Sequence, residues 1–170
     1  MNPTRGLISI EEYLSTVTEP DCEYVSGQIE LRTPGEYDHS TWQVALLGWF
    51  AGHQVEWGIR VLPSLRVRVS EDRFRVPDVT LLSRKAPREQ TITHAPLAVF
   101  EILSPEDTMA RMLEKLADYE RMGISAIWVI EPTKQVYYRF QAGQLTPGAM
   151  FTLPGTSYTV PFTEIAALAQ

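Results

Sequence analysis

The most restrictive feature of the sequence is a pair of apolar segments separated by an amphipathic one. Residues 97–103 are apolar at every position except Glu101, and residues 125–131 form a second short apolar run. This composition is typical of a strand that is covered on both faces, because a half-exposed strand alternates between apolar and polar residues. The intervening residues 106–122 have helical periodicity and end before Gly123. A strand, a helix and a strand in this order predict a right-handed parallel crossover.

Further elements are expected around this unit. Residues 59–69 and 74–82 resemble strands and are close enough in the chain to pair as an antiparallel hairpin. Residues 38–57 carry a broad apolar stripe at helical spacing, and residues 136–140 are expected to pair with 125–131 across a turn. We therefore predict an α/β (α+β) fold in which a mixed β-sheet is flanked by α-helices.

The chain length of 170 residues favours one domain, spanning 1–170. We expect it to have three parts. They are an N-terminal helix and hairpin at 7–32, a core at 38–142, and a C-terminal appendage of strand and helix at 143–170.

Two carboxylates stand where strand composition disfavours them. Glu101 interrupts the apolar segment, and Asp78 lies within the predicted strand 74–82, directly after Pro77. Each acid alone is also compatible with a structural role, as a salt-bridge partner for Glu101 or a strand-end residue for Asp78. Together, two carboxylates from successive strands can hold a divalent cation such as Mg²⁺ or Mn²⁺ through oxygen ligands. Such an ion activates water and polarises a phosphoryl oxygen.

Three more residues are candidates for the same site. Lys115 lies at the edge of the apolar face of helix 106–122, where it either snorkels to solvent or reaches over the sheet to orient water and stabilise phosphorane charge. His39 stands at the start of helix 38–57 and is compatible with surface capping or with contact to phosphate or metal. Glu23 lies in the first hairpin and is either an exposed strand acid or a further ligand for metal or water.

Composition excludes several classes of protein. No apolar run approaches the length of about 20 residues that a membrane span needs, so no membrane association is expected. The beginning of the chain lacks the apolar core and cleavage site of a signal peptide, and the single cysteine, Cys22, cannot form an internal disulfide; both favour a cytoplasmic location. The net charge of -6 counts against tight, salt-driven DNA binding, but a metal site in a nucleic-acid enzyme itself requires clustered carboxylates.

The order and spacing of several short motifs resemble the Uma-two family of restriction-endonuclease-like proteins, in the PD-(D/E)XK nuclease superfamily. The similarity runs from about residue 8 to residue 142. It rests on Cys22-Glu23-Tyr24-Val25-Ser26-Gly27, Pro34 to His39-Ser40, Pro77-Asp78-Val79, Val99-Phe100-Glu101-Ile102-Leu103-Ser104-Pro105, Lys115 to Tyr119, Gly123 and Trp128-Val129-Ile130-Glu131-Pro132.

The resemblance implies a restriction-endonuclease-like nuclease core with a magnesium site. It makes Asp78 the acid of the "PD" element and Glu101 the acid of the "(D/E)XK" element. Leu103 stands where the superfamily pattern has its lysine, and in this family Lys115 on the following helix matches that lysine instead. Glu23 and His39 match polar positions near the site. Arg111 is a departure, because many relatives have an acid at that position.

The resulting hypothesis is a Mg²⁺- or Mn²⁺-dependent endonuclease acting on DNA. Asp78, Glu101 and the backbone carbonyl of Ile102 would bind the metal, and Lys115 would position or deprotonate the attacking water. Relatives of this fold often work as homodimers, for which strand 136–140 and the C-terminal segment are candidate interfaces. Two alternatives stay open: a non-catalytic binding protein on a nuclease scaffold, and a hydrolase of RNA or of a small phosphodiester.

Overall fold

The computed structural model describes residues 6–17 and 21–170. Residues 18–20, within the expected N-terminal part, lie outside the described residues. The helices are α1 (Ile10–Ser15), α2 (Tyr37–Trp57), α3 (Met109–Met122) and α4 (Phe162–Ala166). The strands are β1 (Cys22–Val25), β2 (Gln28–Leu31), β3 (Ile59–Pro63), β4 (Val67–Ser70), β5 (Arg73–Arg75), β6 (Val79–Ser83), β7 (Ala98–Ile102), β8 (Ala126–Glu131), β9 (Val136–Gln141), β10 (Gln144–Pro147), β11 (Met150–Thr152) and β12 (Thr159–Pro161).

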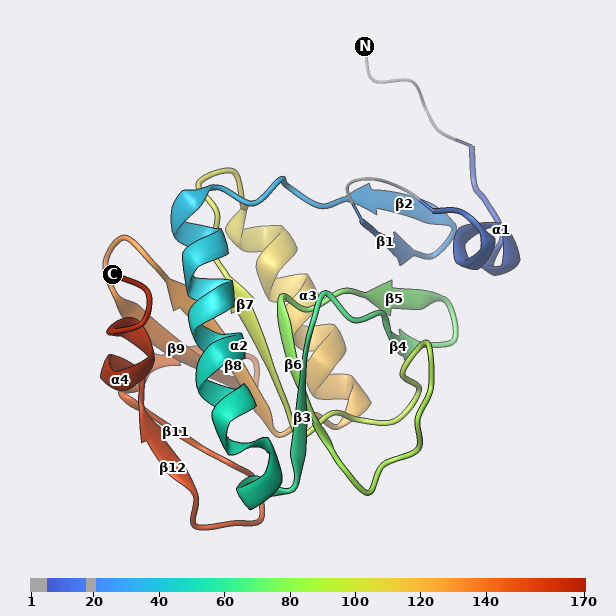
Figure 1. Cartoon of the computed structure of the whole chain (residues 1–170). Coiled ribbons are helices and arrows are strands. Elements are labelled where there is room, and N and C mark those ends of the chain that lie inside the picture. Colours follow the sequence, from blue (N-terminus) through green and yellow to red (C-terminus); the bar gives the residue numbers. More distant parts are fainter. Residues whose placement is uncertain (1–5, 18–20) are drawn as a thin grey trace.

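A mixed six-stranded sheet in the order β10-β9-β8-β7-β6-β3 forms the centre of the protein (Figure 1). Only the β7–β8 pair is parallel among its described strand pairs, as expected from the crossover through α3. Helices α2 and α3 cover opposite faces of this sheet. Phe50 of α2 packs in one apolar cluster with Phe100, and Leu116 of α3 packs in the other with Val99. The predicted mixed sheet with flanking helices is confirmed.

The alternation of side chains along β7 determines where Glu101 points. Phe100 and Ile102 face the α2 side, and Val99 faces the α3 side. Successive side chains of a strand point to opposite faces, so Glu101 must also face α3. The acid that interrupts the apolar segment is therefore directed at the helix that carries Lys115.

The two strands expected at 59–69 and 74–82 are each broken in two, which corrects the sequence prediction. The pairs β3–β6 and β4–β5 are antiparallel, as the expected hairpin requires, but they belong to different sheets. The second sheet has the order β2-β1-β5-β4. One break is at Ser64, which has φ 44°, and the other follows Pro77, whose ring removes a ladder donor. The Ser64 N–H donates to the Asp78 carbonyl at 3.3 Å. The two breaks therefore lie side by side, and both segments pass from one sheet to the other at the same corner.

Helix α3 begins three residues later than the expected start at 106. Ser104 to Asp107 form a turn instead, in which the Ser104 N–H donates to Asp107 Oδ2 at 2.8 Å and the Asp107 N–H donates to the Ser104 carbonyl at 3.0 Å. The Thr108 side chain then caps the helix. The end at Gly123, with φ 98°, is as predicted.

The terminal parts pack on the rest of the chain. In the N-terminal part, Ser9 caps α1, and Tyr13 stacks on Tyr24 of β1 with ring centroids 5.2 Å apart. In the C-terminal part, Phe151 and Phe162 are fully buried in the cluster on the α2 side of the central sheet. Strand β9, at the expected interface 136–140, lies between β8 and β10. Several apolar residues of the C-terminal segment are thus buried within the protomer, whereas Met150 and Leu168 are exposed.

No helix in the described ranges is long and apolar enough to cross a membrane.

Candidate active site

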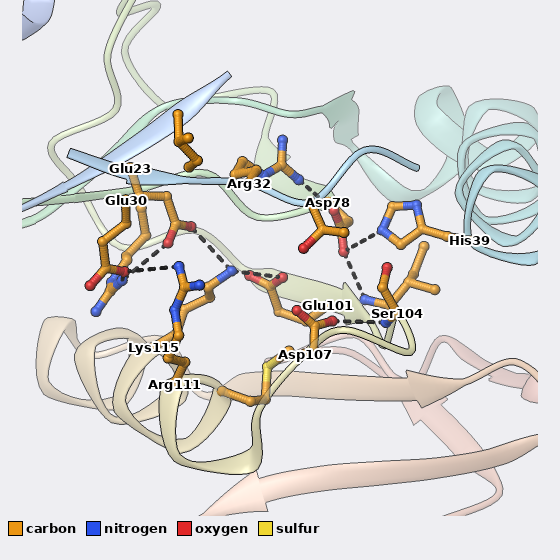
Figure 2. A pocket seen from close by; sticks show the side chains of 15 residues that line it. Glu23, Glu30, Arg32, His39, Asp78, Glu101, Ser104, Asp107, Arg111 and Lys115 are labelled. Atoms are coloured by element: carbon orange, nitrogen blue, oxygen red, sulfur yellow. Dashed lines mark hydrogen bonds and ion pairs between the residues drawn. The ribbon is translucent and has the colours of Figure 1, made fainter. Parts of the chain in front are cut away.

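A small pocket lies where the first hairpin, the start of α2, the corner before β6, the end of β7 and one side of α3 meet (Figure 2). Its enclosed volume is about 50 Å³, and all the side chains predicted for the site contribute to its wall. These residues are Glu23, His39, Asp78, Glu101, Ile102 and Lys115. The fold thus brings together residues that are up to 92 positions apart in the sequence (Glu23 to Lys115).

Asp78 is held at the corner between the two sheets by three donors. Its Oδ1 accepts a hydrogen bond from Arg32 Nη2 at 2.5 Å, and its Oδ2 accepts from the Ile102 N–H at 2.8 Å and lies 3.2 Å from His39 Nε2. The carboxylate is buried, which opposes ionisation, but His39 and Arg32 outweigh burial and hold its pKa below the usual value. Asp78 is therefore ionised at neutral pH.

The negative charge of Glu101 is less well compensated by its neighbours than that of Asp78. Its Oε1 accepts a hydrogen bond from the Tyr119 hydroxyl at 2.5 Å, and its Oε2 lies 3.5 Å from Lys115 Nζ. Burial is the main reason that the pKa of Glu101 rises to about 7; Lys115 opposes this rise, and the Asp78 and Glu23 carboxylates add to it. A buried acid with two acidic neighbours is the kind of group that an additional cation would stabilise.

Lys115 lies between two carboxylates. Its Nζ is 3.2 Å from Glu23 Oε1 and 3.5 Å from Glu101 Oε2. Burial alone would lower the pKa of this ammonium, but the two acids outweigh burial and raise it. Lys115 is therefore charged at neutral pH, which favours the expected orienting and charge-stabilising role over deprotonation of water.

Glu23 acts on the site through Lys115. Besides Lys115, its oxygens accept hydrogen bonds from the Val76 N–H at 3.0 Å and from Arg75 Nη1 at 3.0 Å. Burial opposes the ionisation of Glu23, but Lys115 and Arg75 hold its pKa below the usual value. Both oxygens of Glu23 are engaged and its side chain is buried, so Glu23 is not an exposed strand acid.

His39 stands in the first turn of α2, and its ring contacts Asp78 as described above. Burial lowers the pKa of the imidazole, but the hydrogen bond to Asp78 and the charge of that acid raise it above the usual value. The other ring nitrogen, Nδ1, is buried and has no hydrogen-bond partner among the residues that the structure describes.

Comparison with known proteins identifies the family of this chain. A family model described as "Uma2: Putative restriction endonuclease" matches residues 10–159. The chain belongs to the Uma2 family. The resemblance in the sequence motifs is thereby confirmed, and it makes the chain a member of a nuclease family. A search of the curated proteins found no match.

One solved structure supports the fold of this Uma2 chain. A structure described as "a putative nuclease belonging to DUF820" from Anabaena variabilis ATCC 29413 superposes with a TM-score of 0.82. The two chains are 21% identical, and the match covers 96% of this chain and 99% of the other. A cryoEM structure of a DrdV–DNA complex matches with a TM-score of 0.46 and 16% identity, covering 79% of this chain but 11% of that one. The match to the DrdV–DNA complex is too weak to indicate a substrate for this chain.

Sequence reasoning missed the cations that organise the Uma2 pocket. Arg75 lies within a predicted strand, but it is 1% exposed and bonds to Glu23, Glu30 and Asp118. The sequence pattern indicates neither the contact of Arg32 with Asp78 nor that of the Tyr119 hydroxyl with Glu101. Only Arg75 has a recognisable signal in the sequence. It is a charged residue between the apolar Phe74 and Val76, immediately before the Pro77-Asp78 motif, and this position indicates a buried charge near the site.

The donor types of the pocket fit Mg²⁺ or Mn²⁺. Among residues 6–17 and 21–170, no three His, Cys, Asp or Glu side chains gather as a group that could hold a metal ion. Mg²⁺ does not require such a group, because it is commonly bound by one or two carboxylates together with waters and substrate phosphates. Asp78 and Glu101 supply two carboxylates in one pocket, and both are buried.

We predict that the raised pKa of Glu101 lowers the unfolding free energy of the metal-free protein as pH rises. A folded-state pKa of about 7, above the usual 4.5, means that Glu101 favours the folded state at low pH and loses this contribution as pH rises toward 7. The advantage in unfolding free energy of Glu101→Gln over the wild type should therefore grow by up to about 3 kcal/mol between pH 4 and pH 8. Denaturant unfolding at the two pH values, with EDTA present, measures the change.

Glu23→Gln is the matched control for this prediction. The pKa of Glu23 is lowered in the folded protein, so the stability that it contributes is present above its usual pKa and is lost as pH falls. The Glu23→Gln variant should accordingly lose more stability at pH 8 than at pH 4, opposite to Glu101→Gln. Equal pH trends for the two variants would show that the difference in their environments is misassigned.

Proposed function

We propose that this Uma2 protein is a metal-dependent endonuclease that hydrolyses phosphodiester bonds in DNA. The observation that carries the proposal is the convergence of Asp78, Glu101 and Lys115 in one pocket, from a corner, a strand and a helix. Two carboxylates and one ammonium are the residue types that a PD-(D/E)XK nuclease requires. Membership in a nuclease family supports the same reaction class.

Each residue has a proposed task. Asp78, Glu101 and the carbonyl of Ile102 would hold Mg²⁺ or Mn²⁺, which supplies a polarised phosphoryl oxygen and a more acidic water. Lys115 would place its charge beside the phosphorane as negative charge develops there. Glu23 would hold Lys115 in position, and His39 would hold Asp78 in its ionised form.

Two arginines in the wall of the pocket could contact an anionic substrate, although the net charge of the chain is -6. They are Arg32 and Arg111, and the Arg111 side chain is 58% exposed. Arg111 pairs only loosely with Glu30, at 3.5 Å, and Glu30 already accepts a hydrogen bond from Arg75 at 3.0 Å. Arg111, the residue that departs from the family pattern, therefore adds positive charge at the surface of the pocket.

Labelled duplexes of identical sequence, one DNA and one RNA, test the substrate. With Mg²⁺ or Mn²⁺, the wild type should cleave the DNA duplex, and Asp78→Asn should lower the rate at least about 100-fold. Asp38→Asn is the control, because Asp38 is an exposed acid in the same turn of α2 as His39. Cleavage of the RNA alone would contradict DNA as the substrate, and equal rates for Asp78→Asn and wild type would contradict the site.

One observation favours the second candidate, a non-catalytic protein on a nuclease scaffold. Arg32 and His39 already neutralise Asp78 without any metal. A folded protein that cleaves neither duplex and does not bind Mg²⁺ or Mn²⁺ would support this alternative. The homodimer stays a prediction, and the mass of the protein in solution by light scattering tests it.

A further inference from the structure

Arg32 occupies a place in the site that the proposed reaction does not require. It lies directly after β2, in the segment 32–36 between this strand and α2. Its guanidinium bonds to Asp78 Oδ1 at 2.5 Å and lies 3.4 Å from Ser64 Oγ. The side chain is 17% exposed, and Figure 2 shows it extending to Asp78 from the side of the pocket opposite α3.

The two oxygens of Asp78 differ in how firmly they are occupied. Oδ2 is bonded to the Ile102 N–H of β7 and to His39 of α2, so both partners belong to regular elements. Oδ1 is bonded to Arg32, which belongs to an irregular connection with no helix or strand of its own. Oδ1 is therefore the oxygen whose partner can move away at the lowest cost in packed structure.

A divalent cation and Arg32 cannot share this oxygen without repulsion. At an effective dielectric constant of about 20, like charges 4 Å apart repel by several kcal/mol. The guanidinium also occupies one of the two lone pairs of Oδ1, so it competes with a metal for this oxygen. Arg32 therefore opposes metal binding through both its charge and its position.

We propose that Arg32 is an internal counter-ion of Asp78 that competes with the divalent cation and so sets the cation concentration at which the site fills. This inference rests on the proposed function only in taking Asp78 as a metal ligand. In the metal-free protein, Arg32 keeps the buried Asp78 carboxylate compensated. Arg32 belongs to the wall of this pocket, so a guanidinium released from Asp78 would be close enough to meet a phosphate oxygen.

Calorimetric titration of the full chain with MnCl₂ and with MgCl₂ tests the competition without an activity assay. Arg32→Gln should bind either cation about tenfold more tightly than the wild type, because the competing charge is gone. Arg32→Lys keeps the charge and should bind with nearly wild-type affinity. Arg32→Met, which is also uncharged, repeats the test if Arg32→Gln does not fold, and the melting curve of each variant shows whether it is folded.

Arg111→Gln is the matched control. It removes the same charge from the wall of the same pocket, but Arg111 pairs with Glu30 rather than with Asp78. Its effect on metal affinity should stay within about twofold, as expected for a screened and more exposed charge. An equal gain in cation affinity for Arg111→Gln and Arg32→Gln would overturn direct competition. It would show that the positive charge of the pocket acts only through its overall electrostatic potential.

The titrations separate failure of this inference from failure of the proposed function. If the wild type binds metal, Asp78→Asn does not, and Arg32→Gln binds no more tightly than wild type, the competition is wrong and the metal site stands. If neither the wild type nor Arg32→Gln binds metal at millimolar concentration, both the competition and the metal-dependent function are overturned.

Discussion

Replacing Lys115 by methionine should lower the rate of DNA cleavage by about 100-fold to 1,000-fold. The ammonium lies between Glu23 and Glu101 and is charged at neutral pH, so in the proposed reaction it would stabilise negative charge that develops on the phosphate beside the metal. Methionine has a similar length and no charge. Single-turnover cleavage of a labelled duplex, at a temperature at which the variant is folded, measures the effect.

Two further variants make the Lys115 result specific. Lys115→Arg keeps the charge and should restore part of the rate. Lys85→Met makes the same substitution at an exposed position. Lys85 comes after the last residue of β6, whereas Asp78 precedes the first, so the Lys85→Met variant should cleave at the wild-type rate. A Lys115→Met protein that is folded and fully active would remove Lys115 from the site.

Replacing Arg75 by methionine should cost about 3–5 kcal/mol of unfolding free energy. Arg75 is almost completely buried, and its guanidinium bonds to Glu23 and Glu30 at 3.0 Å and to Asp118 at 2.8 Å. Removing it leaves acids from the first hairpin and from α3 without their shared cation. Breaking a buried ion pair in this way is much more costly than replacing the whole network. Denaturant unfolding in metal-free buffer at pH 7 measures the loss.

Arg73 provides the comparison for Arg75. It lies two residues earlier on the same strand, pairs with Glu114 at 2.8 Å and lies 3.3 Å from Asp118, but its side chain is 25% exposed. Arg73→Met should therefore cost no more than about 1 kcal/mol, as is typical of ion pairs in contact with water. Similar losses for the two variants would show that the burial of Arg75 does not decide its contribution.

The sequence predicted the elements whose signals are local. The apolar segments at 97–103 and 125–131 identified the central parallel pair, and Gly123 marked where the second long helix ends. The unfavourable positions of Asp78 and Glu101 in strands indicated that both belong to one site, and both line the same pocket. These signals are visible because a buried acid or a helix-ending glycine is unusual in its immediate neighbourhood.

Features that depend on tertiary contacts could not be predicted in this way. The corner that splits both hairpin strands between two sheets requires Ser64 and Asp78 to lie opposite each other, which no local pattern indicates. The partners of Arg75 come from the first hairpin and from α3, up to 52 residues away. Arg32 was missed because an arginine in a polar connection is ordinary until the fold brings Asp78 to it.

The central claim is that Asp78 and Glu101 form the metal site of a nuclease, and cleavage of a supercoiled plasmid tests it most directly. The wild type and Glu101→Gln are incubated with Mg²⁺, Mn²⁺ or EDTA, and nicked and linear products are separated on a gel. We predict nicking by the wild type with either metal, none in EDTA, and at least about a 100-fold lower rate for folded Glu101→Gln. Cleavage that persists in EDTA, or that Glu101→Gln carries out at the wild-type rate, would contradict the claim.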